Sequence, residues 1–169
     1  MTCSSHLVNE LRAARGELLA VCRDAPDDAL RHRPPSTHPE PVEGWAALEV
    51  LAHIADVDRY YLSQARAIRD DPGHAFVYFD DEAWKRDNAD AIDRDPHSVR
   101  LALAFAHEEV VRWAGALTPE ELDRAGGHPR RDSITVRAML ERIANHDRNH
   151  AEQVRSALSG WGGASTLDP

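Results

Sequence analysis

The sequence has little of what secreted and membrane proteins need. It contains two cysteines, Cys3 and Cys22, far apart on what the pattern predicts to be one helix. A disulfide framework is therefore excluded, and a reducing compartment is expected. The first six residues show no basic segment followed by an apolar run, and no stretch approaches the roughly 18 apolar residues that cross a membrane. We therefore expect a cytoplasmic protein with no signal peptide and no membrane partner.

Lysine is scarce, and positive charge is outweighed by negative charge. Lys85 is the single lysine. The chain has 20 basic and 29 acidic residues, which gives a formal net charge of −9. Nucleic acids are bound by clustered lysine and arginine, so a nucleic-acid partner is not expected. The content of 42% hydrophobic and 29% charged residues is typical of a globular chain. At 169 residues we expect one domain over residues 1–169, with its core from about residue 5 to 160.

Apolar residues recur at alternating three- and four-residue steps in four segments, as in amphipathic helices. The segments cover about residues 5–24, 45–70, 96–117 and 135–159. Asp95 and Pro96 supply an N-cap and a first helical residue for the third segment. Strand-like alternation is confined to the short, unpaired segment 75–79. The sequence therefore predicts an all-α protein built as a four-helix bundle.

The connection between the second and third predicted helices is unusually long. It covers about residues 71–94, and we expect a short helix near residues 81–91, anchored by Trp84. Such a length allows the two flanking helices to run parallel, as in a crossover bundle. Farther on, Thr118-Pro119-Glu120-Glu121 has the form of a capping box and predicts a one-turn helix.

Two histidines on the last predicted helix are the strongest chemical signal. His146 and His150 are four residues apart, so they share one helix face. They also occupy a stripe that otherwise holds apolar residues. A metal ion bound by both rings would offset the cost of burying them. The alternative is two ordinary helix histidines, because this spacing alone is common.

A third ligand would have to come from another helix, and His53 is the best candidate. It is flanked by apolar residues on the second predicted helix. If the second and fourth helices are antiparallel, His53 and His150 lie at similar depths, roughly 12 and 16 Å from the neighbouring helix ends. His53 could instead be a core histidine that is hydrogen-bonded across the bundle. His107, beside Glu108 and Glu109, is the alternative third ligand.

Several enzyme classes lack their sequence motifs here. The chain contains no glycine-rich phosphate loop and no Gly-x-Ser-x-Gly elbow. His107-Glu108-Glu109 begins like a zincin helix but lacks the second histidine. A di-iron bundle would need Glu-x-x-His twice, and the chain has no such pair.

Three motifs, taken in order, resemble the DinB-like (YfiT-like) metalloenzyme superfamily. They are Arg33-Pro34, the segment 44–54 (GWAALEVLAHI) and the segment 146–153 (HDRNHAEQ), and the resemblance covers roughly residues 7–158. It implies a four-helix bundle in which His53, His146 and His150 hold a divalent metal ion. Zinc is the first expectation, and nickel or iron suits the same ligands.

One residue departs from the family pattern at the start of the second helix. The family often has serine or threonine directly after the tryptophan, whereas this chain has Ala46, with Glu49 retained three residues on. A lost cap costs about 1 kcal/mol, so we expect this helix to start loosely or to be capped in another way. The ligand assignment is unaffected.

The resemblance also implies hypotheses about activity. It favours a thiol-dependent S-transferase that acts on small electrophiles with a low-molecular-weight thiol, because a coordinated thiol is held as thiolate. A metal-dependent hydrolase and a non-catalytic small-molecule-binding or interaction module are the alternatives, and a homodimer is compatible with each. The catalytic residues remain unknown. Candidates to accept the second N–H of a ligand histidine are Asp56, Asp147 and Glu152. Aromatic residues that could line the pocket, or simply fill the core, are Trp45, Tyr60, Tyr61 and Trp84.

Overall fold

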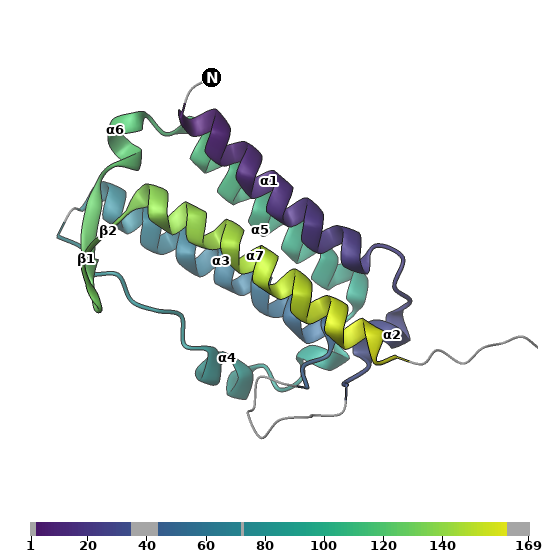
Figure 1. Ribbon diagram of the computed structural model, residues 1–169. Coiled ribbons are helices and arrows are strands. Elements are labelled where there is room, and N and C mark those ends of the chain that lie inside the picture. Colours follow the sequence, from purple (N-terminus) through teal and green to yellow (C-terminus); the bar gives the residue numbers. More distant parts are fainter. Residues whose placement is uncertain (1–2, 35–43, 72, 162–169) are drawn as a thin grey trace, which may run out of the picture.

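Four long helices form the body of the protein (Figure 1). The computed structural model describes residues 3–34, 44–71 and 73–161. The long helices are α1 (Cys3–Cys22), α3 (Ala47–Asp70), α5 (Pro96–Ala116) and α7 (Val136–Ser159). They match the four predicted segments to within a few residues at each end. The predicted all-α four-helix bundle is therefore confirmed.

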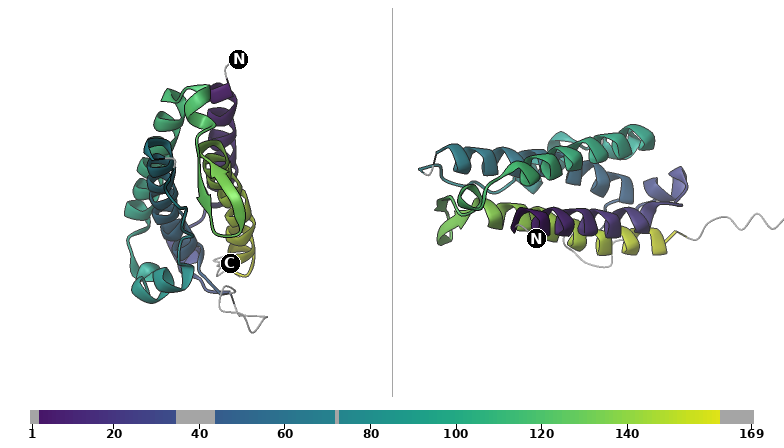
Figure 2. Two further views of the ribbon diagram at one scale, coloured as in Figure 1. Left: turned by 90° about the vertical axis from the view of Figure 1, so that its left-hand side faces the viewer. Right: turned by 90° about the horizontal axis from the view of Figure 1, so that it is seen from above.

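The long helices run in an order that requires a crossover. α3 and α5 are parallel, and α1 and α7 run together in the opposite direction (Figures 1 and 2). At one end of the bundle, Ser4 in α1 donates a hydrogen bond to the carbonyl of Leu117, just after α5 (2.8 Å). The chain between α3 and α5 returns along the length of the bundle, as its length predicts. The antiparallel arrangement of α3 and α7 brings the start of α3 beside the second half of α7.

Short helices occupy the connections. They are α2 (Asp27–Arg31), α4 (Asp81–Asp87), the 3-10 helix η1 (Ala91–Asp93) and α6 (Pro119–Leu122). The helix predicted near residues 81–91 thus divides into α4 and η1. At α6 the predicted capping box is present, because the Glu121 N–H donates to Thr118 Oγ1 (3.2 Å) and the Thr118 N–H donates to Glu121 Oε2 (2.9 Å).

Glutamate and arginine hold the start of α3, where the usual capping hydroxyl is missing. The Ala46 N–H donates to Glu49 Oε2 at 2.9 Å, which is one half of a capping box. Arg33 binds the same carboxylate through Nε (3.0 Å) and Nη2 (2.5 Å). This bidentate pair fixes Glu49 and ties the chain before α3 to its first turn. The motifs around Arg33 and Glu49 therefore act together as a helix start.

A β-hairpin lies between α6 and α7, where the sequence analysis expected no strand. β1 (Ala125–His128) pairs antiparallel with β2 (Arg131–Thr135). The sequence predicts that the strand-like segment 75–79 has no partner. In the structure Ala75, its first residue, forms a parallel bridge with Gly127 of β1. The strands are short and β1 contains two glycines, which have low strand propensity, so alternation gave no signal.

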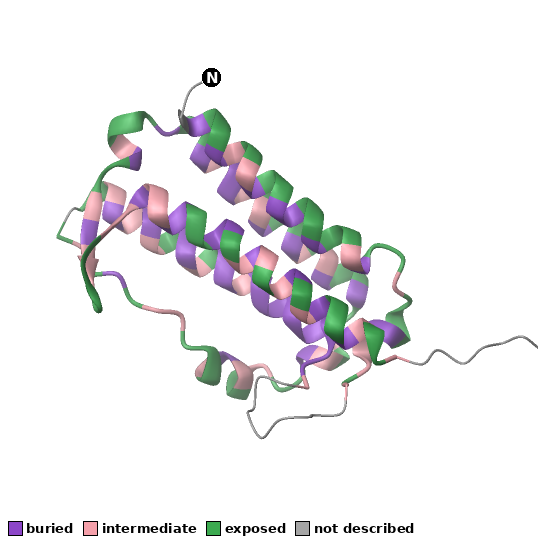
Figure 3. Ribbon diagram, in the orientation of Figure 1, coloured by how far each residue is buried: buried purple, intermediate pink, exposed green. Residues whose placement is uncertain are grey.

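The bundle buries the apolar stripes predicted from the sequence (Figure 3). Buried apolar side chains form two clusters, one toward each half of the bundle. The polar side chains of Arg15, Asp58, His107 and Asp147 come from helix turns between these clusters, one from each long helix. Within the described parts of the chain, no helix is long and apolar enough to cross a membrane.

Candidate metal centre

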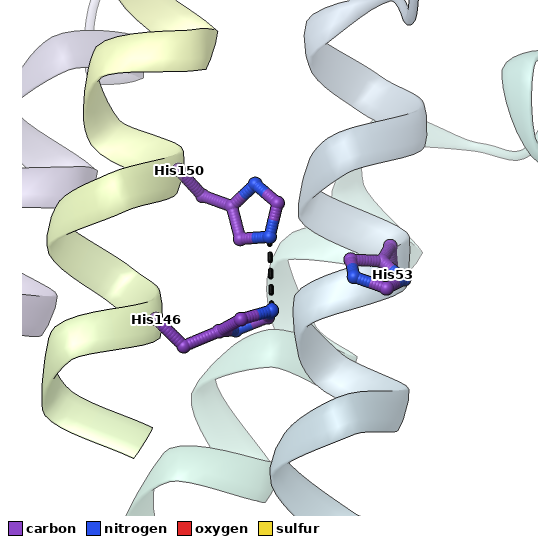
Figure 4. Close-up of side chains that lie close together, drawn as sticks. All are labelled: His53, His146 and His150. Carbon is purple, nitrogen blue, oxygen red and sulfur yellow. Dashed lines mark hydrogen bonds between the residues drawn. The ribbon is translucent and has the colours of Figure 1, made fainter. Parts of the chain in front are cut away.

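The three histidines singled out from the sequence meet between α3 and α7 (Figure 4). Each offers a ring nitrogen within 4.8 Å of the others. The two Nε2 atoms of His146 and His150 lie 2.9 Å apart, and the ring centroid of His53 is 5.4 and 5.2 Å from the centroids of these two rings. The i, i+4 spacing on α7 and the antiparallel α3 produce this convergence. His53 is 2% exposed, and the other two are partly buried.

Aromatic rings enclose His53 on its other sides. Trp84 and Trp45 lie 5.0 and 5.2 Å from its ring centroid, and Phe79 lies 5.6 Å away, all in edge-type contacts. The Trp84 indole N–H donates to Asp56 Oδ2 at 2.9 Å, which fixes α4 against α3. Trp45 and Trp84 thus border the site, and these contacts exclude water from one side of His53.

The other two aromatic candidates lie elsewhere. Tyr60 packs against Phe79 with ring centroids 5.3 Å apart, and its hydroxyl donates to the carbonyl of Val77. Tyr61 is buried in the core, 5.1 Å below the guanidinium of Arg142. Neither contacts a histidine of the cluster through any ring contact or hydrogen bond among the described residues.

The buried histidine nitrogens lack the partners that the sequence analysis assigned to them. Nδ1 of His53 and of His146 are buried without a hydrogen-bond partner among the described residues. His150 Nδ1 lies 2.6 Å from Gln153 Oε1, a partner that its i+3 position on the helix could have suggested. Polar nitrogens left unpaired in a protein interior are costly unless a further partner binds them.

The three predicted carboxylate partners bind other groups. Asp56 accepts from Trp84 and from Arg59, and Glu152 pairs with Arg155 on the surface. Asp147 pairs with Arg15. The prediction that one of these carboxylates orients a ligand histidine is therefore wrong. The helix phase places these three carboxylates near the histidines, but it does not show whether each side chain points toward the cluster or to the side of it.

Burial keeps the cluster neutral. Desolvation, with a smaller contribution from the nearby His150, lowers the pKa of His53 to about 3. Burial also lowers the pKa of His146 well below its ordinary value, helped by the other two rings, and lowers that of His150. Neutral imidazoles keep the lone pairs that bind metal ions. At neutral pH the site therefore presents three nitrogen donors.

A buried charge network holds α7 next to the cluster. Arg15 donates from Nε and Nη2 to the two carboxylate oxygens of Asp147 (both 2.9 Å), and from Nη2 to Asp58 (2.6 Å). Its Nη1 binds the carbonyl of Leu103 at 3.2 Å. These contacts join all four long helices one residue away from His146. The network fixes the position of the α7 turn that carries the first histidine of the pair.

Two further residues define the limits of the site. His107, the alternative third ligand, is on α5 and does not belong to the three-histidine cluster. Asp81, which the sequence analysis did not single out, places Oδ1 3.6 Å from His53 Nε2. It is the first residue of α4, and its neighbour Asp80 caps that helix by accepting from the Ala83 N–H. The crossover segment therefore brings a carboxylate to the cluster.

The donor set fits a divalent cation. Three neutral imidazoles leave a coordination position for another molecule, as in catalytic zinc sites. The contact between His146 Nε2 and His150 Nε2 at 2.9 Å fits this assignment, because two neutral rings turn nitrogen atoms toward a common point that a cation would occupy. A surface cavity of about 350 Å³ on the side of the hairpin is lined in part by His146, so it reaches one ring of the cluster.

Known proteins are similar to this chain in sequence and in fold. The DinB superfamily matches residues 10–154. A relative from Oceanobacillus iheyensis, named "Putative metal-dependent hydrolase OB0413", is 26% identical over 125 residues, which cover 71% of this chain and 68% of the relative.

A solved structure agrees. YfiT from Bacillus subtilis, described as "a probable metal-dependent hydrolase with an unusual four-helix bundle topology", is similar with a TM-score of 0.73 and 20% identity, over 94% of this chain and 89% of YfiT. Because the family match spans most of the sequence and the fold agrees, this protein belongs to the DinB superfamily.

Proposed function

We propose that this protein is a metal-dependent hydrolase of small molecules, with His53, His146 and His150 as the metal ligands. The observation that carries the proposal is the convergence of three neutral ring nitrogens within 4.8 Å beside an open cavity. A divalent ion with an open position lowers the pKa of water toward neutrality and polarises a carbonyl. Zinc is the first candidate, with nickel and iron as alternatives.

The surrounding residues have distinct roles in this proposal. Trp45, Trp84 and Phe79 exclude water behind His53, which strengthens electrostatic interactions at the site. Asp81 Oδ1, 3.6 Å from the His53 ring, is positioned to accept the proton from an attacking water molecule.

Hydrolysis replaces thiol transfer as the leading hypothesis. The family resemblance by itself favours a thiol-dependent S-transferase. The two relatives described above are both named as hydrolases, which supports the other alternative. The same donors could hold a thiolate, so the experiment must offer both reactions.

The test uses the protein loaded with zinc, nickel or iron in turn. Each form is given a panel of small esters and amides, and separately a generic electrophile with several cellular thiols. We expect hydrolysis that disappears on chelation and in His146→Ala. Asp81→Asn should keep the metal but lose most of the rate. Thiol-dependent turnover without hydrolysis would reverse the assignment, and metal binding without any turnover would favour a binding module.

A further inference from the structure

The cavity beside His146 has an unusual charge for this chain. It lies between the hairpin and the first half of α7 and has a volume of about 350 Å³. Two arginines line it, Arg131 from β2 and Arg142 from α7, together with Glu141 and the polar side chains of Asn145 and Asn149. The whole chain has a net charge of −9, so a cavity whose lining carries a net positive charge stands out.

Arg142 is held in place by aromatic rings and not by an acid. Its guanidinium carbon lies 5.1 Å from the ring centroids of both Tyr61 and Tyr78. It precedes His146 by four residues, so both side chains lie on the same face of α7. Within residues 3–34, 44–71 and 73–161, neither Arg142 nor Arg131 forms an ion pair, whereas Arg137 and Arg148, which are also on α7, each do.

A third arginine, Arg130, packs on Tyr78, one of the residues that line the cavity. Arg130 lies over the Tyr78 ring at 5.3 Å, and the Tyr78 hydroxyl lies 3.1 Å from His128 Nε2. Desolvation first, and then Arg131, Arg142 and Arg130, lower the pKa of His128, so this ring stays neutral and adds no charge. Among the described residues, the guanidinium groups of Arg131 and Arg142 therefore lie at the cavity without a direct ion pair, and Glu141 is the single carboxylate in its lining.

We propose that Arg142, assisted by Arg131, binds a carboxylate group of the substrate while the bond to be hydrolysed lies at the three-histidine cluster. Guanidinium groups bind carboxylates in bidentate geometry, and an unpaired guanidinium on a rigid helix is prepared for that contact. Glu141 offsets one of the two lining arginines, so one net positive charge remains. That balance matches a carboxylate better than a phosphate dianion.

This inference rests on the proposed function only for the position of the reacting group. The test therefore separates binding at the metal from binding at Arg142. Acetohydroxamate is the probe for the metal alone. The monohydroxamates of malonate, succinate and glutarate add a carboxylate at increasing distance, and each has a neutral control in which an amide replaces the carboxylate. Dissociation constants are measured by calorimetry on the zinc-loaded protein.

For at least one chain length, the carboxylate should improve affinity over its amide by about tenfold or more, as expected of a hydrogen bond between charged groups. Arg142→Gln should abolish most of that gain and leave acetohydroxamate affinity unchanged. Arg131→Gln should reduce it less. The matched control is Arg155→Gln, an exposed arginine of α7 that pairs with Glu152 and does not line the cavity.

A second arm uses metal-free protein, titrated with N-acetylglycine and N-acetylglycinamide. Arg142-dependent binding of the acid alone supports the carboxylate subsite whether or not zinc binds. Failure of acetohydroxamate to bind zinc-loaded protein counts against the proposed metal site. Equal affinities for acid and amide in both arms would overturn the subsite, and a phosphonate that binds tighter than the carboxylate would overturn the choice of anion.

Discussion

Replacing Arg15 with methionine leaves two buried carboxylates without their shared counter-ion. Asp58 and Asp147 are both fully buried, and Arg15 itself is 3% exposed. The guanidinium makes three hydrogen bonds to these carboxylates, at 2.6, 2.9 and 2.9 Å. Removing one partner of a buried ion pair costs about 3–5 kcal/mol, chiefly because a charge is left uncompensated. We expect Arg15→Met to lower the free energy of unfolding by that amount near neutral pH.

The loss should depend on pH in a way that simple loss of packing does not. Burial already raises the pKa of Asp58 to about 7, although Arg15 opposes the shift. Burial also raises the pKa of Asp147. Without Arg15 both pKa values rise further above their unfolded values. Below those values the folded variant binds more protons than the unfolded chain, so its stability increases as the pH falls. The deficit relative to the natural protein should therefore shrink between about pH 8 and about pH 5.5.

Urea denaturation of metal-free protein, followed by circular dichroism, measures both effects. Arg12→Met is the control, because Arg12 is exposed on the same helix and should change stability by less than about 0.5 kcal/mol. If Arg15→Met does not fold at the higher pH, Arg15→Lys keeps the charge and should show an intermediate loss. A loss below about 1 kcal/mol, or an equal loss at both pH values, would refute the reasoning.

Three further outcomes follow from local contacts. Gly126→Ala should destabilise the protein by about 1–3 kcal/mol in chemical denaturation, because the new Cβ would lie 2.4 Å from the carbonyl oxygen of His74; an unchanged midpoint would contradict this close approach. Thr135→Ala should cost about 1 kcal/mol in the same assay, because the Thr135 hydroxyl caps α7 by accepting from the Ala138 N–H at 3.1 Å; Thr135→Ser should restore most of it. Burial, and then two nearby arginines, lower the pKa of His107 to about 4. As the pH drops, His107 is therefore protonated in the unfolded chain before it is protonated in the folded protein. The free energy of unfolding should fall as the pH drops from about 6.5 toward 4. His107→Gln should make that fall shallower by up to about 1.4 kcal/mol per pH unit, and an unchanged slope would contradict the assignment.

Periodicity and spacing predicted the architecture and the three-histidine cluster. The four apolar stripes gave the helices, and the long connection after α3 gave the crossover. His146 and His150 share a face because of helix geometry, and antiparallel packing of α3 and α7 adds His53 at the same depth. These features follow from short-range rules combined with one assumption about helix direction.

The features that the sequence did not predict are the hairpin, the position of Asp81 and the buried charge network. They depend on the path of the chain or on single polar residues. The hairpin has short strands with two glycines, and Asp81 reaches His53 only because α4 packs through Trp84 on α3. The buried charge network did leave a signal in the sequence. Asp58 and Asp147 each occupy a position in an otherwise apolar, buried stripe, which predicts that a buried cation must pair with them.

The most direct test of the account is the zinc content of the purified protein after chelation and reloading. We measure bound zinc per chain by mass spectrometry for the natural protein and for His53→Ala, His146→Ala and His150→Ala. His107→Ala is the matched control, since that histidine is partly buried in the same layer of the bundle but lies outside the cluster. We expect one zinc per chain in the natural protein and the control, and a large loss in each of the other three. Full zinc content in His53→Ala, or a loss in His107→Ala equal to theirs, would contradict the proposed metal site.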